Sequence, residues 1–196
     1  MSAPPVLQAL RGRTAELHRR LDGQLPVGRE DASLDDYLAH LRVLGPWMVQ
    51  MRLALAEARV PALAAVAARI DDRSRALALD LGLEDAGAGL RVDASECRRF
   101  PLPACEPQAF AWGLAYVVEG SQLGGAVMYR RLSTRLAPHP LRYFAPVAGA
   151  TTGAAWTAFV AALGAAVRSR PAIESAADGA AAAFEHLLAG FALDAA

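Results

Sequence analysis

The chain has 196 residues, of which 54% are hydrophobic, and its 20 basic residues balance its 20 acidic residues. This length and composition suit one domain with a sizeable buried core. A formal net charge of zero creates no overall field that would attract nucleic acid or an acidic membrane surface, so we expect neither as a partner.

The N-terminus and the two cysteines fit a reducing compartment. The first residues lack a basic region followed by an apolar run, and no apolar stretch reaches the ~18 residues that span a bilayer. Cys97 and Cys105 lie in a proline-bearing loop without a nearby histidine, which favours free thiols over a zinc site. We therefore expect a soluble, cytoplasmic protein.

The first two segments of the chain have helical spacing. Leucines recur every three or four residues over 4–25, which predicts an amphipathic helix. A second helix is expected to begin at Ser33, with Asp36 completing a capping box, and to run towards residue 60. Gly45 and Pro46 inside this second pattern predict a kink or a break.

The rest of the chain also favours helices, and no alternating strand pattern is present. The sequence therefore predicts an all-α, single-domain bundle. The remaining expected elements are one or two short helices over 61–90, a loop over 90–107, a glycine-bearing helix over 108–136, a loop over 137–153, and helices over 153–169 and 171–191.

His18 lies on the first helix, on the same side as part of its apolar stripe. An imidazole there can bind haem iron, although a lone histidine at such a position is more often a partly buried structural residue. His40, His139 and His186 form no paired metal-binding pattern, which disfavours a di-iron site. Ser121 lacks the strand–turn–helix context of a nucleophile elbow.

The glycine-bearing helix is the most unusual segment. Gly120, Gly124 and Gly125 lie within two turns, and each costs roughly 1 kcal/mol relative to alanine inside a helix. One interpretation is close packing against another helix. The other is a flat ligand lying directly against the backbone of a helix that bends, with Glu119 and Ser121 adding polar groups there.

Together these segments resemble the haem oxygenase family, most closely its bacterial, bacteriophytochrome-associated branch. LRGRTAELHRRLD (10–22) resembles the proximal helix of that branch, and LAYVVEGSQLGGAVMYRRL (114–132) resembles its distal helix. Four further segments are similar in the same order: SLDDYLAHLRVL (33–44), ALALDLGLED (76–85), YFAPVAGATTGAAWTAF (143–159) and AAAAFEHLLAGF (180–191).

This resemblance implies a single haem oxygenase-like domain over 1–196. It implies that haem, as both substrate and cofactor, is opened by O2 to biliverdin, CO and ferrous iron. The chain has no GxGxxG nucleotide motif, so a reductase or ferredoxin must supply the electrons. The branch also suggests a bacteriophytochrome as a partner.

The resemblance assigns a role to particular residues. His18 is the expected iron ligand. The expected distal, catalytic wall consists of Gly120, Ser121, Gly124 and Gly125. The other expected haem contacts are Arg11, Tyr116, Arg130, Phe184 and Phe191.

The chain departs from the family pattern in two respects. Ser121 stands where some members carry an aspartate that organises distal water, so Glu119 or Tyr116 is expected to take part instead. Basic residues that certain members have near the position of Trp156 are absent. These departures keep open a haem-binding protein without catalysis. Because all-α folds host several functions, a haem-free helical domain with another ligand or partner is a further alternative.

Overall fold

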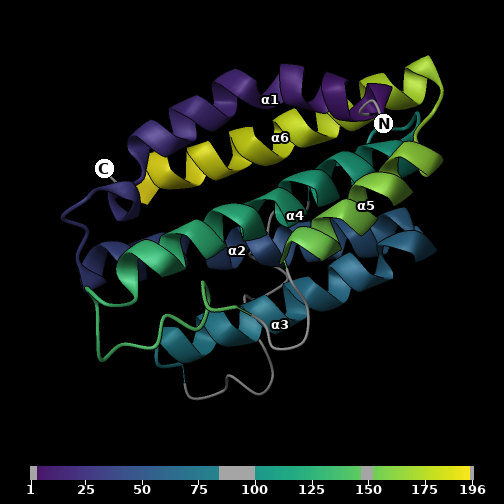
Figure 1. The fold of residues 1–196 in the computed structure, drawn as a ribbon. Coiled ribbons are helices and arrows are strands. Elements are labelled where there is room, and N and C mark those ends of the chain that lie inside the picture. Colours follow the sequence, from purple (N-terminus) through teal and green to yellow (C-terminus); the bar gives the residue numbers. More distant parts are fainter. Residues whose placement is uncertain (1–3, 84–99, 147–151, 195–196) are drawn as a thin grey trace.

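The computed structural model describes residues 4–83, 100–146 and 152–194 of the chain (Figure 1). These residues form six α-helices, two short 3-10 helices and no strand, which confirms the predicted all-α class. The expected loop over 90–107 lies mostly outside the described residues, as does Cys97, whereas Cys105 is an exposed free thiol. The helices are α1 (Pro5–Gln24), η1 (Pro26–Gly28), α2 (Leu34–Ala58), η2 (Pro61–Leu63), α3 (Ala64–Asp80), α4 (Pro107–Leu132), α5 (Thr152–Ala166) and α6 (Arg170–Asp194).

The helices are stacked in layers. Helices α1 and α6 lie side by side on one side of the molecule, α3 lies on the other, and α2 and α4 lie between them (Figure 1). Helices α1 and α6 run in the same direction, because Arg13 pairs with Asp178 while His18 contacts Phe184 further along both helices. None of the helices in the described part of the chain combines the length and apolar character needed to cross a bilayer.

Helices α4 and α6 approach each other closely through glycines. A Cβ atom on Gly113 would lie 1.9 Å from the Ala176 carbonyl oxygen, and one on Gly179 would lie 2.2 Å from the Phe110 carbonyl oxygen. No side chain fits at either position without separating the two helices. The close helix packing that small residues permit is therefore located at Gly113 and Gly179.

Helix α2 begins as predicted. The Ser33 hydroxyl accepts a hydrogen bond from the Asp36 backbone N–H (3.1 Å), and the Ser33 backbone N–H donates to the Asp36 carboxylate (2.8 Å). Of the expected kink or break at Gly45 and Pro46, the break is wrong, because α2 continues through both residues, and the kink stays a prediction. Proline removes one backbone donor, but burial of this central helix along much of its length outweighs that loss.

A buried carboxylate joins α3 to the segment that follows α4. The fully buried Asp80 side chain accepts hydrogen bonds from the Tyr37 hydroxyl (2.6 Å) and the Tyr143 backbone N–H (2.9 Å). It also pairs with Arg142 at 3.2 Å. Burial and the bond to Asp80 raise the pKa of Tyr37, so its hydroxyl stays a donor. This network holds Tyr143 and Phe144 against α2.

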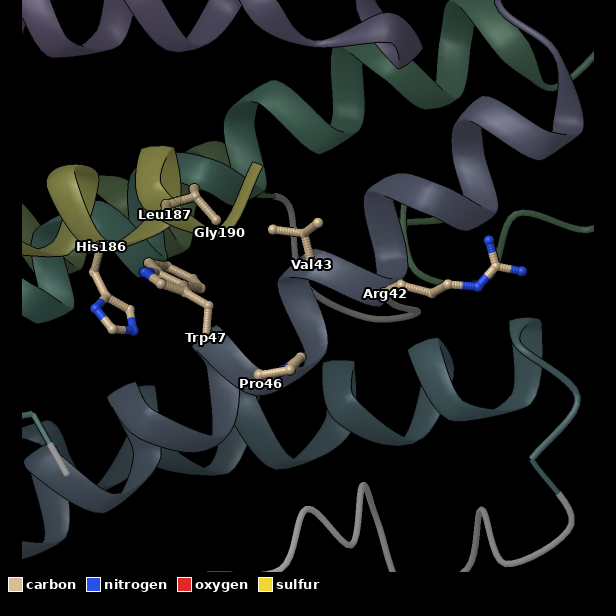
Figure 2. A pocket seen from close by; sticks show the side chains of 7 residues that line it. All are labelled: Arg42, Val43, Pro46, Trp47, His186, Leu187 and Gly190. Atoms are coloured by element: carbon tan, nitrogen blue, oxygen red, sulfur yellow. The ribbon is translucent and has the colours of Figure 1, made fainter. Parts of the chain in front are cut away.

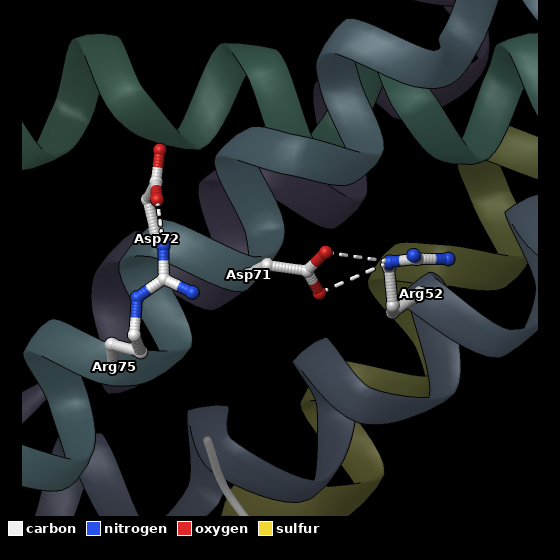
Figure 3. Close-up of polar contacts among 4 residues, drawn as sticks. All are labelled: Arg52, Asp71, Asp72 and Arg75. Atoms are coloured by element: carbon white, nitrogen blue, oxygen red, sulfur yellow. Dashed lines mark hydrogen bonds and ion pairs between the residues drawn. The ribbon is translucent and has the colours of Figure 1, made fainter. Parts of the chain in front are cut away.

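Ion pairs at the surface also join α2 to α3. Arg52 of α2 reaches both carboxylate oxygens of Asp71 in α3, at 3.0 and 3.2 Å, and Asp72 pairs with Arg75 within α3 (Figure 3). Exposed pairs of this kind contribute little to stability. The position of α3 therefore depends mainly on Asp80 and the apolar core.

Candidate functional site

A cavity of about 420 Å³ lies between α1, α2, α4 and α6. Most of its wall is apolar, which suits a ligand with a large hydrophobic surface. His18 reaches it from α1, and the 120–125 segment reaches it from α4. Eight of the ten residues assigned from the sequence line this cavity: Arg11, His18, Tyr116, Gly120, Ser121, Gly124, Gly125 and Phe184.

His18 is held at the rim of the cavity with one ring nitrogen engaged. Its side chain is 62% exposed, so it is not a structural histidine of the core. Its Nδ1 lies 2.9 Å from an Asp22 carboxylate oxygen one helical turn later, and its ring lies 5.7 Å from that of Phe184. A carboxylate beside Nδ1 favours a proton on that nitrogen, which leaves the lone pair of Nε2 free to bind a metal.

The metal-binding side chains at this cavity fit haem iron, which is already bound by the porphyrin. Within the described residues, no three histidine, cysteine or acidic side chains gather into a metal site. A bare metal ion needs several protein ligands close together, whereas haem iron already has four porphyrin nitrogens and needs only one from the protein. An apolar slot with a single histidine at its rim therefore fits haem.

The three glycines in the 120–125 segment of α4 line the cavity, and none of them is pressed against the backbone of another helix. A Cβ atom on Gly124 would meet nothing within 4 Å, and one on Gly120 would have Trp156 as its nearest neighbour at 3.9 Å. On Gly125, the nearest atom would be Phe144 Cδ1 at 3.4 Å. These values contrast with the backbone clashes at Gly113. Packing of the described helices therefore does not require glycine at 120 or 124, and the flat-ligand interpretation is favoured.

One end of the cavity opens beside a cation. Arg11 and Tyr116 line both the cavity and a shallower hollow along the outer side of α1, which also contains Arg19 and Asp22. Burial raises the pKa of Tyr116, and the nearby Thr14 hydroxyl and Arg11 guanidinium oppose that rise. This exposed guanidinium can pair with a carboxylate of a bound ligand.

Two polar groups expected near the ligand are engaged elsewhere. The Ser121 hydroxyl donates to the Val118 carbonyl oxygen at 2.7 Å within the same helix. Glu119 is 3% exposed and pairs with Arg69 of α3 at 2.8 Å, and it does not line the cavity. Of the two residues proposed to replace the absent aspartate, only Tyr116 lies at the cavity.

The sequence analysis did not identify His40 as a site residue. This buried histidine of α2 lines the cavity, and its Nδ1 has no hydrogen-bond partner among the described residues. Its ring stacks on Phe191 (5.4 Å, 17°) and lies 5.8 Å from Phe144, and burial lowers its pKa to about 4. Its position four residues before Leu44 and seven before Trp47, which also line the cavity, was the available signal.

Two assigned residues do not line the cavity. Phe191 lies behind His40 and supports it by stacking. Arg130 is exposed near the end of α4 and is not part of the cavity wall. Its contact with a propionate stays a prediction.

A second hollow of about 310 Å³ lies between α2 and α6 (Figure 2). Trp47, Leu187 and His186 gather on one side of it, while the Arg42 side chain extends away from them. Trp47 and Leu187 also line the larger cavity, and the Trp47 indole N–H donates to the Ala183 carbonyl oxygen at 3.0 Å. These two side chains therefore form part of the wall between the hollows.

Comparisons with known proteins identify the family and the fold. The family model described as heme oxygenase matches residues 5–191. A curated heme oxygenase of Xanthomonas campestris pv. campestris (strain 8004) is 40% identical over 100 residues, which are 50% of this chain and 56% of that relative. The fold matches the NO- and CO-bound heme oxygenase of Neisseria meningitidis with a TM-score of 0.69 at 22% identity, over 96% of this chain and 91% of that one.

Proposed function

The chain belongs to the haem oxygenase family, and on this premise we propose that it opens haem to biliverdin, CO and ferrous iron. The reaction would consume O2 and electrons delivered by a separate reductase or ferredoxin. The observation that carries the proposal is the shared cavity, which His18 enters from α1 and the glycine backbone enters from α4. A bacteriophytochrome that receives the biliverdin remains a suggestion of the sequence resemblance.

Bound haem would supply the iron that activates dioxygen and the meso carbon that is oxidised. In this proposal, His18 Nε2 would hold the haem iron. Asp22 holds the imidazole through Nδ1 and makes Nε2 a stronger donor. Its carboxylate is thus a positioning group and touches no reacting atom.

The glycine backbone would lie against the opposite face of the substrate. Without side chains at Gly120, Gly124 and Gly125, the α4 backbone can approach a flat ligand and limit the room above it. The close backbone would also leave little room for bulk solvent on that face of the substrate. Apolar residues such as Phe184 and Leu187 would keep bulk water away.

Arg11 would hold a propionate at the open end of the cavity. Arg130 is a second proposed anchor, although it must approach from outside the present wall. The absence of basic residues around Trp156 makes Arg11 the main cation at this end. Removing it is expected to weaken binding of haem more than binding of a porphyrin with esterified propionates.

The test is a spectroscopic turnover experiment. Haemin is added to the purified protein, and then ascorbate or a reductase is added under air. We expect a Soret band that decays as the broad absorption of biliverdin appears. An intact Soret band, or ring opening that proceeds equally without the protein, would refute the proposal.

Binding of haem without catalysis is the second candidate. Two observations favour it: the Ser121 hydroxyl, although at the cavity, donates to the Val118 carbonyl, and Glu119 pairs with Arg69 away from the cavity. Stoichiometric haemin binding without ring opening would support this alternative. A spectrum of haemin that does not change on adding the protein would instead support a haem-free domain.

A further inference from the structure

The His40 imidazole is a polar group that the proposed function does not use. It is buried in the cavity wall, its ring is fixed between Phe144 and Phe191, and its Nδ1 has no hydrogen-bond partner among the described residues. A buried polar atom without a partner costs free energy, and phenylalanine would fill the same space without that cost. A ligand that provides a hydrogen-bond partner would explain why an imidazole stands here.

His40 and Arg11 reach the cavity beside different stretches of α4. Arg11 lies beside Tyr116. A Cβ on Gly125 would contact Phe144, and Phe144 contacts His40. The nine steps from Tyr116 to Gly125 advance about 14 Å along α4. We call these two stretches the Arg11 end and the His40 end of the cavity.

The two ends suit different edges of a porphyrin. Arg11 at the open end fits the propionates, so the edge that carries no carboxylates would point towards His40. In haem, that edge consists of carbon and hydrogen and offers no acceptor. When it is opened, the meso carbon leaves as CO, and each flanking pyrrole carbon gains a carbonyl oxygen from O2, with the electrons supplied by the external reductant. The product therefore has two acceptors where the substrate has none.

We propose that His40 recognises the ring-opened product, by donating a hydrogen bond from an imidazole N–H to a lactam carbonyl oxygen of the linear tetrapyrrole. This inference rests on the proposed function. A neutral imidazole carries one N–H donor, and the apolar rings of Phe144 and Phe191 leave that donor to the ligand. Since the bond exists only after ring opening, His40 distinguishes product from substrate.

The test compares the dissociation constants of haemin and biliverdin, both measured by quenching of tryptophan fluorescence. His40→Phe keeps an aromatic ring that can stack on Phe191 and removes both nitrogens. His40→Gln keeps an N–H donor and guards against a variant that misfolds. Gln50→Met is the matched control, because Gln50 also lies on α2, is buried and has an unpartnered side-chain oxygen, but does not line the cavity.

We expect His40→Phe to weaken biliverdin binding about tenfold. Haemin binding should change less than threefold, Gln50→Met should change neither constant, and His40→Gln should recover part of the loss. If His40→Phe weakens the binding of haemin and biliverdin equally, or leaves biliverdin affinity unchanged, the inference is overturned. Normal turnover of haem in the same experiment would leave the proposed function standing. A wild-type protein that cannot open haem would defeat the proposed function and this inference with it.

Discussion

The substitution Gly124→Ala separates the two possible reasons for glycine in α4. A Cβ atom at this position would meet nothing within 4 Å, and the backbone φ there lies outside the left-handed region. Alanine inside a helix is favoured over glycine by about 1 kcal/mol. The protein without ligand should therefore gain about 1 kcal/mol in free energy of unfolding, or roughly 2–4 °C in Tm for a chain of this size.

The same methyl group should damage ligand binding. It would project into the space that a flat ligand needs, and overfilling a packed site costs about 1–3 kcal/mol, equivalent to roughly a tenfold to hundredfold higher Kd. The assay combines thermal unfolding with haemin titration of the same preparation. Gly124→Ala should thus raise stability and lower haemin affinity together.

Gly113→Ala is the matched comparison on the same helix. Its Cβ would lie 1.9 Å from the Ala176 carbonyl oxygen, so α4 and α6 must separate, at a cost of at least about 3 kcal/mol. If Gly124→Ala destabilises the protein as Gly113→Ala does, then Gly124 serves helix packing. If Gly124→Ala binds haemin with unchanged affinity, the cavity is not the slot proposed here.

Three further predictions follow from individual contacts. Asp22→Asn should weaken haemin binding about tenfold, measured by titration, because His18 loses its carboxylate partner. The free energy of unfolding should stay within about 0.5 kcal/mol of the wild type. An unchanged haemin affinity would show that Asp22 has no role at the site. Asp80→Asn should lower the free energy of unfolding in urea by about 3–5 kcal/mol, because a buried network with Tyr37 is broken; a loss below about 1 kcal/mol would contradict that network. The pKa of His40 is about 4 in the folded protein and 6.5 when unfolded, so protons bind the unfolded state first as pH falls. As the pH falls from 6.5 to 4, the wild type should lose about 3 kcal/mol of its free energy of unfolding relative to His40→Phe. If the free energies of unfolding of the two proteins change in parallel with pH, His40 is not buried as a neutral group.

Local patterns predicted the helices well, because their determinants lie within a few residues of each other. The Ser33–Asp36 capping box and the leucine spacing of α1 are of this kind. Of the kink or break expected at Pro46, the break is wrong because tertiary burial holds α2 together, and burial is not visible in a local motif.

The site was predicted where it depends on one helix and missed where it depends on several. Gly124 and His18, which their own segments and the family resemblance indicated, both line the cavity. Glu119 was placed near the ligand because it precedes Gly120, yet its partner Arg69 is distant in the sequence and draws it towards α3. His40 was overlooked because its place in the cavity wall arises only when Phe144 and Phe191 pack around it.

The most direct test of the central claim identifies the axial ligand of bound iron. Resonance Raman spectra of the reduced haem complex report an iron–imidazole stretching band when a neutral histidine is bound. This account predicts the band in the wild type, its absence in His18→Ala, and its return when free imidazole is added to that variant. A band that persists in His18→Ala without added imidazole, and disappears only in His40→Phe, would contradict it.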